Sequence, residues 1–276
     1  MAEPKGYSIH IGVNSVDPDH YNGWSGPLNA CEADAEDMAS LASKNDFSST
    51  ILLTKEATRD TVIATVEKAA ETLKAGDMLL LSYSGHGGQI PDRSGDEEDR
   101  VDETWCLYDG QLLDDELNLL WSKFKPEVRV LLLSDSCHSG TVARDMAMSP
   151  GPVTEEPAMG APRFMPSVEA RKTYRANREF YDKISESMPE TIDVKADGLL
   201  ISGCQDSQLS RDGTFNGAFT GQLLRTWKRG TFQGNYDEFR EQINTGLRDD
   251  QTPNLFRFGA EDPSFTLARP FQIKRS

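Results

Sequence analysis

The sequence lacks the patterns that mark several common classes of protein. Its 276 residues include only four cysteines, Cys31, Cys106, Cys137 and Cys204, and none forms a C-x-x-C pair. This wide spacing argues against a zinc site and a small disulfide framework, and free thiols fit a reducing compartment. No apolar run is long enough to span a bilayer, and no apolar signal segment follows the first residues. We therefore expect a cytoplasmic protein with no membrane partner.

Basic residues are also scarce. The chain has 29 Lys and Arg against 45 Asp and Glu, a formal net charge of −16. A protein this acidic lacks the excess of basic residues that binds nucleic-acid phosphates, so we expect no nucleic-acid partner. Neither the phosphate-binding pattern G-x-x-x-x-G-K-[ST] nor a G-x-G-x-x-G after the first apolar run is present, which argues against a nucleotide-binding protein.

Apolar runs alternate with amphipathic segments along the chain. We expect strands at 8–14, 49–54, 78–83, 128–133, 198–203 and 264–268, and a short accessory strand at 105–107. Helices are expected at 28–44, 58–74, 114–124, 216–229 and 236–247. This alternation predicts an α/β fold with a mostly parallel sheet and helices on both faces. Between 146 and 196, six prolines and many charges predict a linker or insertion, with a helix near 167–186.

Two of the expected strands end in reactive side chains. Residues 78–83 lead into Ser84-Gly85-His86-Gly87, and residues 128–133 lead into Asp135-Ser136-Cys137-His138-Ser139-Gly140. Ligands of open α/β sheets bind outside the carboxyl ends of strands, so neighbouring strands would bring His86 and Cys137 together. An imidazolium beside a thiol lowers the pKa of that thiol, and the imidazole can protonate a leaving amine. The backbone N–H groups of Gly87 and Cys137 could then face the developing oxyanion.

Either residue alone has an ordinary explanation, since a lone cysteine is usually a small buried hydrophobe. The joint pattern resembles the catalytic signature of the caspase-like cysteine peptidases, most closely the metacaspase and bacterial orthocaspase branch. The resemblance implies a three-layer sandwich around a mostly parallel six-stranded sheet. It also implies a p20-like catalytic region over 1–145, the linker over 146–196, and a p10-like region over 197–276 that completes the sheet. The implied activity is peptide-bond hydrolysis through a thioester on Cys137, with His86 as acid and base and no cofactor required for the chemistry.

Carboxylates decide the expected specificity. The metacaspase branch cleaves after Arg or Lys, and it uses acidic residues to hold that side chain. The resemblance assigns this pocket to Asp34 and Cys31, in Cys31-Glu32-Ala33-Asp34-Ala35, and to Asp135, with Asp206 as a further candidate. Such carboxylates complement a guanidinium or an ammonium, so the expected partners are peptides or proteins with basic residues. Turn capping by Asp135 and a solvated position for Asp34 are the alternatives.

Calcium and self-cleavage are two further expectations. The family resemblance suggests Ca²⁺ as an activator, with Asp102, Asp114 and Asp115 as ligands, although a solvated acidic loop is the better default explanation of these residues. Basic residues in the linker are candidate self-cleavage sites if the specificity is basic. They are Arg163, Arg171, Lys172, Arg175, Arg178 and Lys183.

Two alternatives to a peptidase stay open. The chain could be a catalytically silent caspase-like protein that acts as a regulatory binding module, or a transpeptidase that uses the same thioester. The intact pair of His86 and Cys137 argues against the first, and sequence does not separate the second from hydrolysis. The sequence makes no prediction of oligomeric state.

Overall fold

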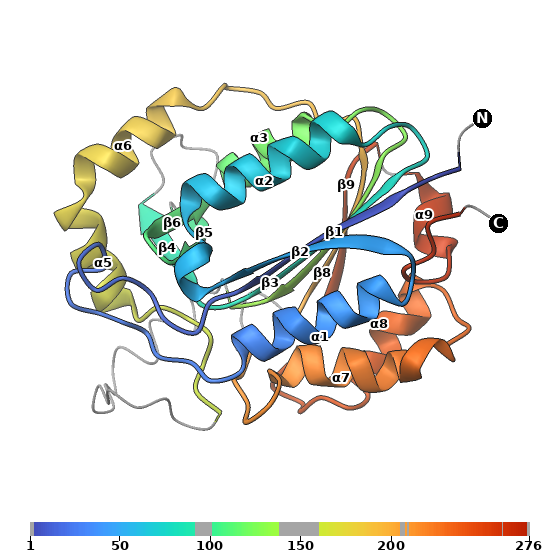
Figure 1. Ribbon diagram of the computed structural model, residues 1–276. Coiled ribbons are helices and arrows are strands. Elements are labelled where there is room, and N and C mark those ends of the chain that lie inside the picture. Colours follow the sequence, from blue (N-terminus) through green and yellow to red (C-terminus); the bar gives the residue numbers. More distant parts are fainter. Residues whose placement is uncertain are drawn as a thin grey trace.

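A six-stranded sheet forms the centre of the molecule (Figure 1). The computed structural model describes residues 3–91, 101–137, 160–204, 208, 210–260 and 262–274. The strand order is β2-β1-β3-β7-β8-β9, and every neighbouring pair is parallel except β8 with β9. The strands are β1 (Gly6–Gly12), β2 (Phe47–Leu53), β3 (Met78–Ser84), β7 (Arg129–Asp135), β8 (Asp197–Ser202) and β9 (Asn254–Gly259). Residues from both sides of the expected linker thus share one sheet.

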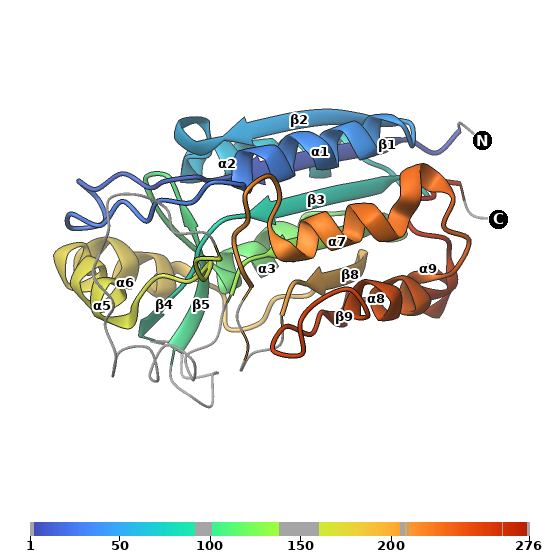
Figure 2. The ribbon, with the colours of Figure 1, turned by 90° about the horizontal axis from the view of Figure 1, so that it is seen from below.

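Helices cover both faces of the sheet, as the apolar runs predicted (Figures 1 and 2). On one face lie α2 (Arg59–Thr72) and α3 (Asp114–Ser122); on the other lie α1 (Cys31–Ser43), α7 (Ala218–Trp227) and α8 (Tyr236–Asn244). Each face has its own apolar core, and β3 and β7 are buried along their whole length between the two cores. Strands in such a position need apolar side chains on both faces, which explains their unbroken apolar runs.

A smaller sheet lies beyond the carboxyl end of β3. It is antiparallel and consists of β4 (Gly87–Pro91), β5 (Val101–Leu107) and β6 (Gly110–Leu113). Helices α5 (Ser167–Ala176) and α6 (Arg178–Ser187) pack beside it. The Tyr181 hydroxyl anchors them through a 2.7 Å hydrogen bond with Nε2 of His20 and accepts one from the Gln111 backbone. The segment before these helices is therefore held next to the end of β3.

Most predicted elements are present, with some differences. The prediction of a last strand at 264–268 is wrong: that segment contains the short helix α9 (Pro263–Leu267), which starts with Asp262 as N-cap and Pro263 in its first turn. The last strand is β9, ten residues earlier, antiparallel to β8. The helix predicted near 167–186 exists as two helices that meet at Asn177. None of the helices in the described ranges is long and apolar enough to cross a membrane.

Candidate active site

Strands β3 and β7 deliver His86 and Cys137 to one place. The two strands are parallel neighbours in register, with Ser84 opposite Asp135. His86 and Cys137 each follow two residues after this last pair, and both are buried. The backbones that carry the two reactive residues therefore lie next to each other at these strand ends.

Glycine at position 87 allows the two chains to approach. A Cβ placed on Gly87 would lie 1.7 Å from the backbone oxygen of Cys137, closer than any side chain tolerates. The backbone nitrogens of Gly87 and Cys137 both donate hydrogen bonds to the carbonyl oxygen of Arg163, at 3.0 and 3.1 Å. The sequence suggested these two N–H groups as oxyanion donors, and here they converge on a carbonyl of the chain itself.

Backbone contacts orient the imidazole of His86. Its Nε2 lies 3.0 Å from the carbonyl oxygen of Gly26, which can only accept, so Nε2 carries the proton. The Trp24 ring packs against the imidazole, with the two centroids 4.9 Å apart. The His86 carbonyl accepts from the Tyr83 hydroxyl at 2.7 Å. Nδ1 is buried with no hydrogen-bond partner among the described residues, and in a neutral ring it is the nitrogen that accepts a proton.

Burial keeps both groups neutral in this state. It lowers the pKa of His86 to about 4, an effect opposed by the Gly26 carbonyl and partly by the Phe164 backbone. Burial also raises the pKa of the Cys137 thiol, and the neighbouring Cys204 thiol raises it further. The sequence suggested a thiolate beside an imidazolium. The structure instead favours a neutral thiol and a neutral imidazole, because both side chains are buried.

Residues 161–165 cross the site with a bend at Arg163 and an isolated backbone bridge on either side of it. Before Arg163, two backbone hydrogen bonds hold the segment. The Arg163 N–H donates to the Ser210 carbonyl at 3.0 Å, and the Asp212 N–H donates to the Ala161 carbonyl at 2.8 Å. These bonds make an antiparallel bridge between Pro162 and Arg211. Beyond Arg163, the Met165 N–H donates to the Gly87 carbonyl at 2.8 Å. A peptide bound by strand addition in this way is a common mode of recognition by peptide-binding sites.

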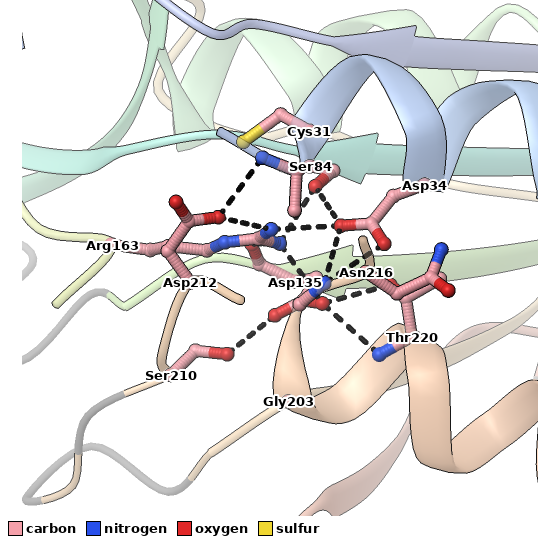
Figure 3. Close-up of polar contacts among 12 residues, drawn as sticks. Cys31, Asp34, Ser84, Asp135, Arg163, Gly203, Ser210, Asp212, Asn216 and Thr220 are labelled. Atoms are coloured by element: carbon pink, nitrogen blue, oxygen red, sulfur yellow. Dashed lines mark hydrogen bonds and ion pairs between the residues drawn. The ribbon is translucent and has the colours of Figure 1, made fainter. Parts of the chain in front are cut away.

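The Arg163 side chain enters a pocket of carboxylates (Figure 3). Its guanidinium lies 2.8 Å from Asp34, 2.9 Å from Asp135 and 3.0 Å from Asp212, and it donates to the Ser84 hydroxyl at 2.7 Å. Arg163 has no exposed surface. A planar cation with donors at both ends suits carboxylates arranged on several sides of it.

Other donors hold each of the three carboxylates in place. Asp34 accepts from the Ser84 hydroxyl at 2.7 Å and from the Gly217 N–H at 3.0 Å. Asp135 accepts from the hydroxyl and the N–H of Thr220, at 2.7 and 3.0 Å, and from the Ser210 hydroxyl. These bonds fix the oxygens before any ligand arrives, so the pocket is organised in advance for a cation.

Asp212 is fixed by the start of α1. Its carboxylate accepts from the backbone N–H groups of Asn29 and Ala30, at 2.7 and 3.2 Å. One guanidinium therefore faces three buried carboxylates, an excess of negative charge. Burial raises the pKa of Asp34 to about 6, Arg163 opposes that rise, and Asp135 adds to it.

The remaining residues suggested for the pocket lie in different places. Cys31 is fully buried beside the pocket, and burial raises the pKa of its thiol to about 12, so it contributes volume rather than charge. Asp206 lies outside the described residues.

Of the candidate self-cleavage residues, only Arg163 lies in the site. The others lie on the two helices beyond it, where the backbone is not extended. They are Arg171, Lys172 and Arg175 on α5, and Arg178 and Lys183 on α6.

The suggested calcium ligands lie apart from this site. Asp102 is buried in β5, and Asp114 and Asp115 begin α3, where the carboxylate of Asp114 accepts from the backbone of Asp115. Within the described residues, no group of three or more His, Cys, Asp or Glu side chains has an arrangement that could hold a metal ion. Calcium activation stays a prediction from the resemblance.

Several residues of the site were not identified from the sequence. Gly26 and Asp212 stand in segments without a recognisable motif, and nothing in the sequence signals their contacts. Ser84 stands inside a recognised motif and Thr220 in an expected helix, but neither was assigned a role. These four residues come from three separate parts of the sequence, and only the fold brings them together.

A family model matches most of the chain. The model described as caspase domain matches residues 16–262. Metacaspase-1A of Aspergillus clavatus is 28% identical over 249 residues, which cover 78% of this chain and 56% of the length of that protein. Metacaspase-1 of Pyricularia oryzae is 28% identical over 279 residues, with 88% of this chain and 67% of that protein covered. This chain thus spans little more than half the length of the first of these relatives.

Solved structures agree on the fold. A crystal structure of protein GSU0716 from Geobacter sulfurreducens is 55% identical, with a TM-score of 0.89 over 98% of this chain and 99% of that one. Caspase-1 of Spodoptera frugiperda is 9% identical, with a TM-score of 0.52 over 93% of this chain and 87% of that one. The latter likeness concerns the fold alone and confirms the caspase-like α/β sandwich.

Proposed function

This chain belongs to the caspase domain family, in its metacaspase branch, and from that premise we propose that it is a cysteine endopeptidase that cleaves after Arg or Lys. The observation that carries the proposal is the position of Arg163. Its carbonyl receives both candidate oxyanion donors while its side chain fills the carboxylate pocket. The chain's own arginine thus lies where a substrate's basic residue would lie.

In the proposed reaction each group of the site has one role. Cys137 Sγ attacks the carbonyl carbon of the basic residue, and Nδ1 of His86 takes the thiol proton. The oxyanion that forms is stabilised by the N–H groups of Gly87 and Cys137. His86 then returns the proton to the leaving amine as the peptide bond breaks and a thioester remains on Cys137. Water hydrolyses the thioester and regenerates the thiol.

The same geometry supports self-cleavage between Arg163 and Phe164. Backbone bridges hold the segment on both sides of Arg163, and the bond after Arg163 is the one whose carbonyl meets the donors. The other basic residues beyond it lie on helices. Among the linker candidates we therefore assign self-cleavage to Arg163, and until that bond is cut the segment occupies the site that an external substrate needs.

A panel of fluorogenic peptides tests the proposed specificity. Four peptides carry Arg, Lys, Asp or Leu before the reporter group, and each is assayed with calcium and with excess chelator. We expect turnover of the Arg and Lys peptides only. Turnover of the Asp peptide alone would overturn the pocket assignment, and activity unchanged by chelator would remove calcium as an activator. A catalytically silent protein would turn over none of them and would leave Cys137 unlabelled by a thiol-reactive arginyl probe.

A further inference from the structure

The substrate-like segment does not end at the bond to be cleaved. Phe164, directly after it, is only 4% exposed and forms an apolar cluster with Cys137 and Cys204. Met165, one residue further, is fully buried in the main core. The site therefore encloses side chains on both sides of the bond, and the first side chain after it contacts the nucleophile's own cluster.

Backbone pairing holds Phe164 beside Gly87, directly after the catalytic histidine candidate. Gly87 donates to the carbonyl before Phe164 and accepts from the N–H after it, which makes a parallel bridge between Gly87 and Phe164. The Arg163 guanidinium lies among carboxylates, whereas the Phe164 side chain lies in the apolar cluster with Cys137 and Cys204. The side chains before and after the bond therefore occupy chemically different surroundings.

Before the bond, the backbone contacts do not discriminate among residues at the position that Pro162 occupies. Pro162 lies opposite Arg211 in the antiparallel bridge. The two hydrogen bonds of this bridge are made by the flanking residues Ala161 and Arg163, so the backbone of Pro162 makes neither of them. A proline loses no hydrogen bond there. Backbone contacts thus tolerate any residue at that position, and the enclosed side chains on either side of the bond remain as the ones that can discriminate.

We propose that this site selects peptides with a large apolar residue, aromatic or long aliphatic, directly after the basic residue, and that Cys204 is a specificity-determining residue of that subsite. The inference rests on the proposed peptidase function and refines its substrate class. The subsite becomes available to an external peptide once Phe164 has left it.

The chemistry of the subsite gives the reason. The Cys204 thiol is 6% exposed and points its hydrogen at the Ser136 carbonyl, 3.6 Å away, so it offers a soft apolar surface that suits an aromatic ring. A carboxylate or amide placed there would lose its hydration without gaining a partner. A glycine would leave the volume of the Phe164 ring unfilled.

Internally quenched peptides test this inference. The series Ala-Pro-Arg-X-Met, with X as Phe, Leu, Gly or Asp, is assayed with the full-length protein, and kcat/KM is compared within the series. We expect the Phe and Leu peptides to exceed the Gly and Asp peptides by about 10- to 100-fold, the range that side-chain contacts in an apolar pocket provide. Equal rates across the series, or faster cleavage of the Gly peptide, would overturn the subsite while leaving the peptidase proposal intact. Cleavage of no peptide would contradict the peptidase proposal and this inference with it.

Two variants of Cys204 test its role. Cys204→Leu fills part of the subsite, so the ratio of the Phe to the Gly peptide should fall toward one. Cys204→Ser keeps the volume nearly unchanged and should retain most of that ratio. Circular dichroism and the thermal midpoint of each variant establish that it folds. A folded Cys204→Leu protein with the original ratio would contradict the role of Cys204.

Discussion

The carbonyl oxygen of Arg163 lies 3.1 Å from the backbone nitrogen of Cys137, which donates a hydrogen bond to it. The same oxygen accepts from Gly87, so the bond after Arg163 is polarised by two donors beside the candidate nucleophile. Together with the carboxylates around the guanidinium, this contact is the observation on which the proposed self-cleavage rests.

If Arg163 occupies the pocket, removing its side chain should admit an external ligand. In a Cys137→Ala protein, which cannot cut itself, the native segment should exclude a fluorescent Ala-Pro-Arg amide. Adding Arg163→Ala should restore binding by at least about tenfold, because a tethered competitor acts at a high effective concentration. Fluorescence anisotropy measures this, and Arg171→Ala, an exposed change on α5, is the matched control. Equal binding by all three proteins would show that Arg163 does not occupy the pocket in solution.

The Gly26 carbonyl should be a positioning contact for His86. Gly26 has a positive φ of +49°, and a Cβ there would lie 2.6 Å from Trp24 and 3.0 Å from the His86 ring. Gly26→Ala should therefore displace the imidazole and lower kcat about 10- to 100-fold with a smaller change in KM.

Gly23→Ala is the control for that variant. Gly23 also has a positive φ, +93°, but a Cβ there meets no atom within 4 Å. Both variants should lose about 1 kcal/mol of unfolding free energy from backbone strain, and only Gly26→Ala should lose activity. Equal kcat in the two proteins would contradict the positioning role.

Activity on Arg substrates should decline in mild acid. Burial raises the pKa of Asp34 to about 6 even with Arg163 beside it. Below that pH the carboxyl is neutral and its ion pair is lost, so KM for an Arg peptide should rise as the pH falls from 7 to 5. Asp34→Asn should lower kcat/KM about 10- to 100-fold at pH 7 and remove this dependence. An identical pH profile in both proteins would exclude Asp34 as its source.

Stability should show the opposite sign. The pKa of Asp34 is raised from 3.8 in the unfolded chain to about 6 in the folded one, so the folded state binds more protons between these values. Its contribution to the free energy of unfolding is full below about pH 4 and is lost as the pH rises through 6. Urea unfolding of the native chain and of Asp34→Asn at pH 4, 5, 6 and 7 measures that difference. A difference that does not change with pH would contradict the raised pKa.

The fold and the reactive pair were predictable because they depend on local patterns. The unbroken apolar runs of β3 and β7 indicated buried parallel strands, and the residues after them indicated the pair. The segment at 264–268 was misjudged, because a short apolar stretch does not distinguish a strand from the capped turn at Asp262. Strand β9, only partly buried at the edge of the sheet, gave a weaker signal.

The rest of the site depends on contacts that no local pattern encodes. Asp212 reaches the pocket from the loop before α7, and Gly26 meets His86 across 60 positions of sequence. The position of Arg163 in the site could be narrowed to a few candidates from the sequence, because Arg163 is one of the basic residues of the linker. Only the pairing of residues 161–165 with Gly87 and Ser210 separates it from the others.

The masses of the chain's own fragments test the proposed self-cleavage most directly. Purified protein, alone in solution, is incubated, and its fragments are measured by intact mass spectrometry and N-terminal sequencing. We predict a fragment that ends at Arg163 and another that begins at Phe164, neither of which forms in Cys137→Ala. A Cys137→Ala protein cut at the same bond, or a native chain cut only on α5 and α6 with Arg163–Phe164 intact, would contradict the account.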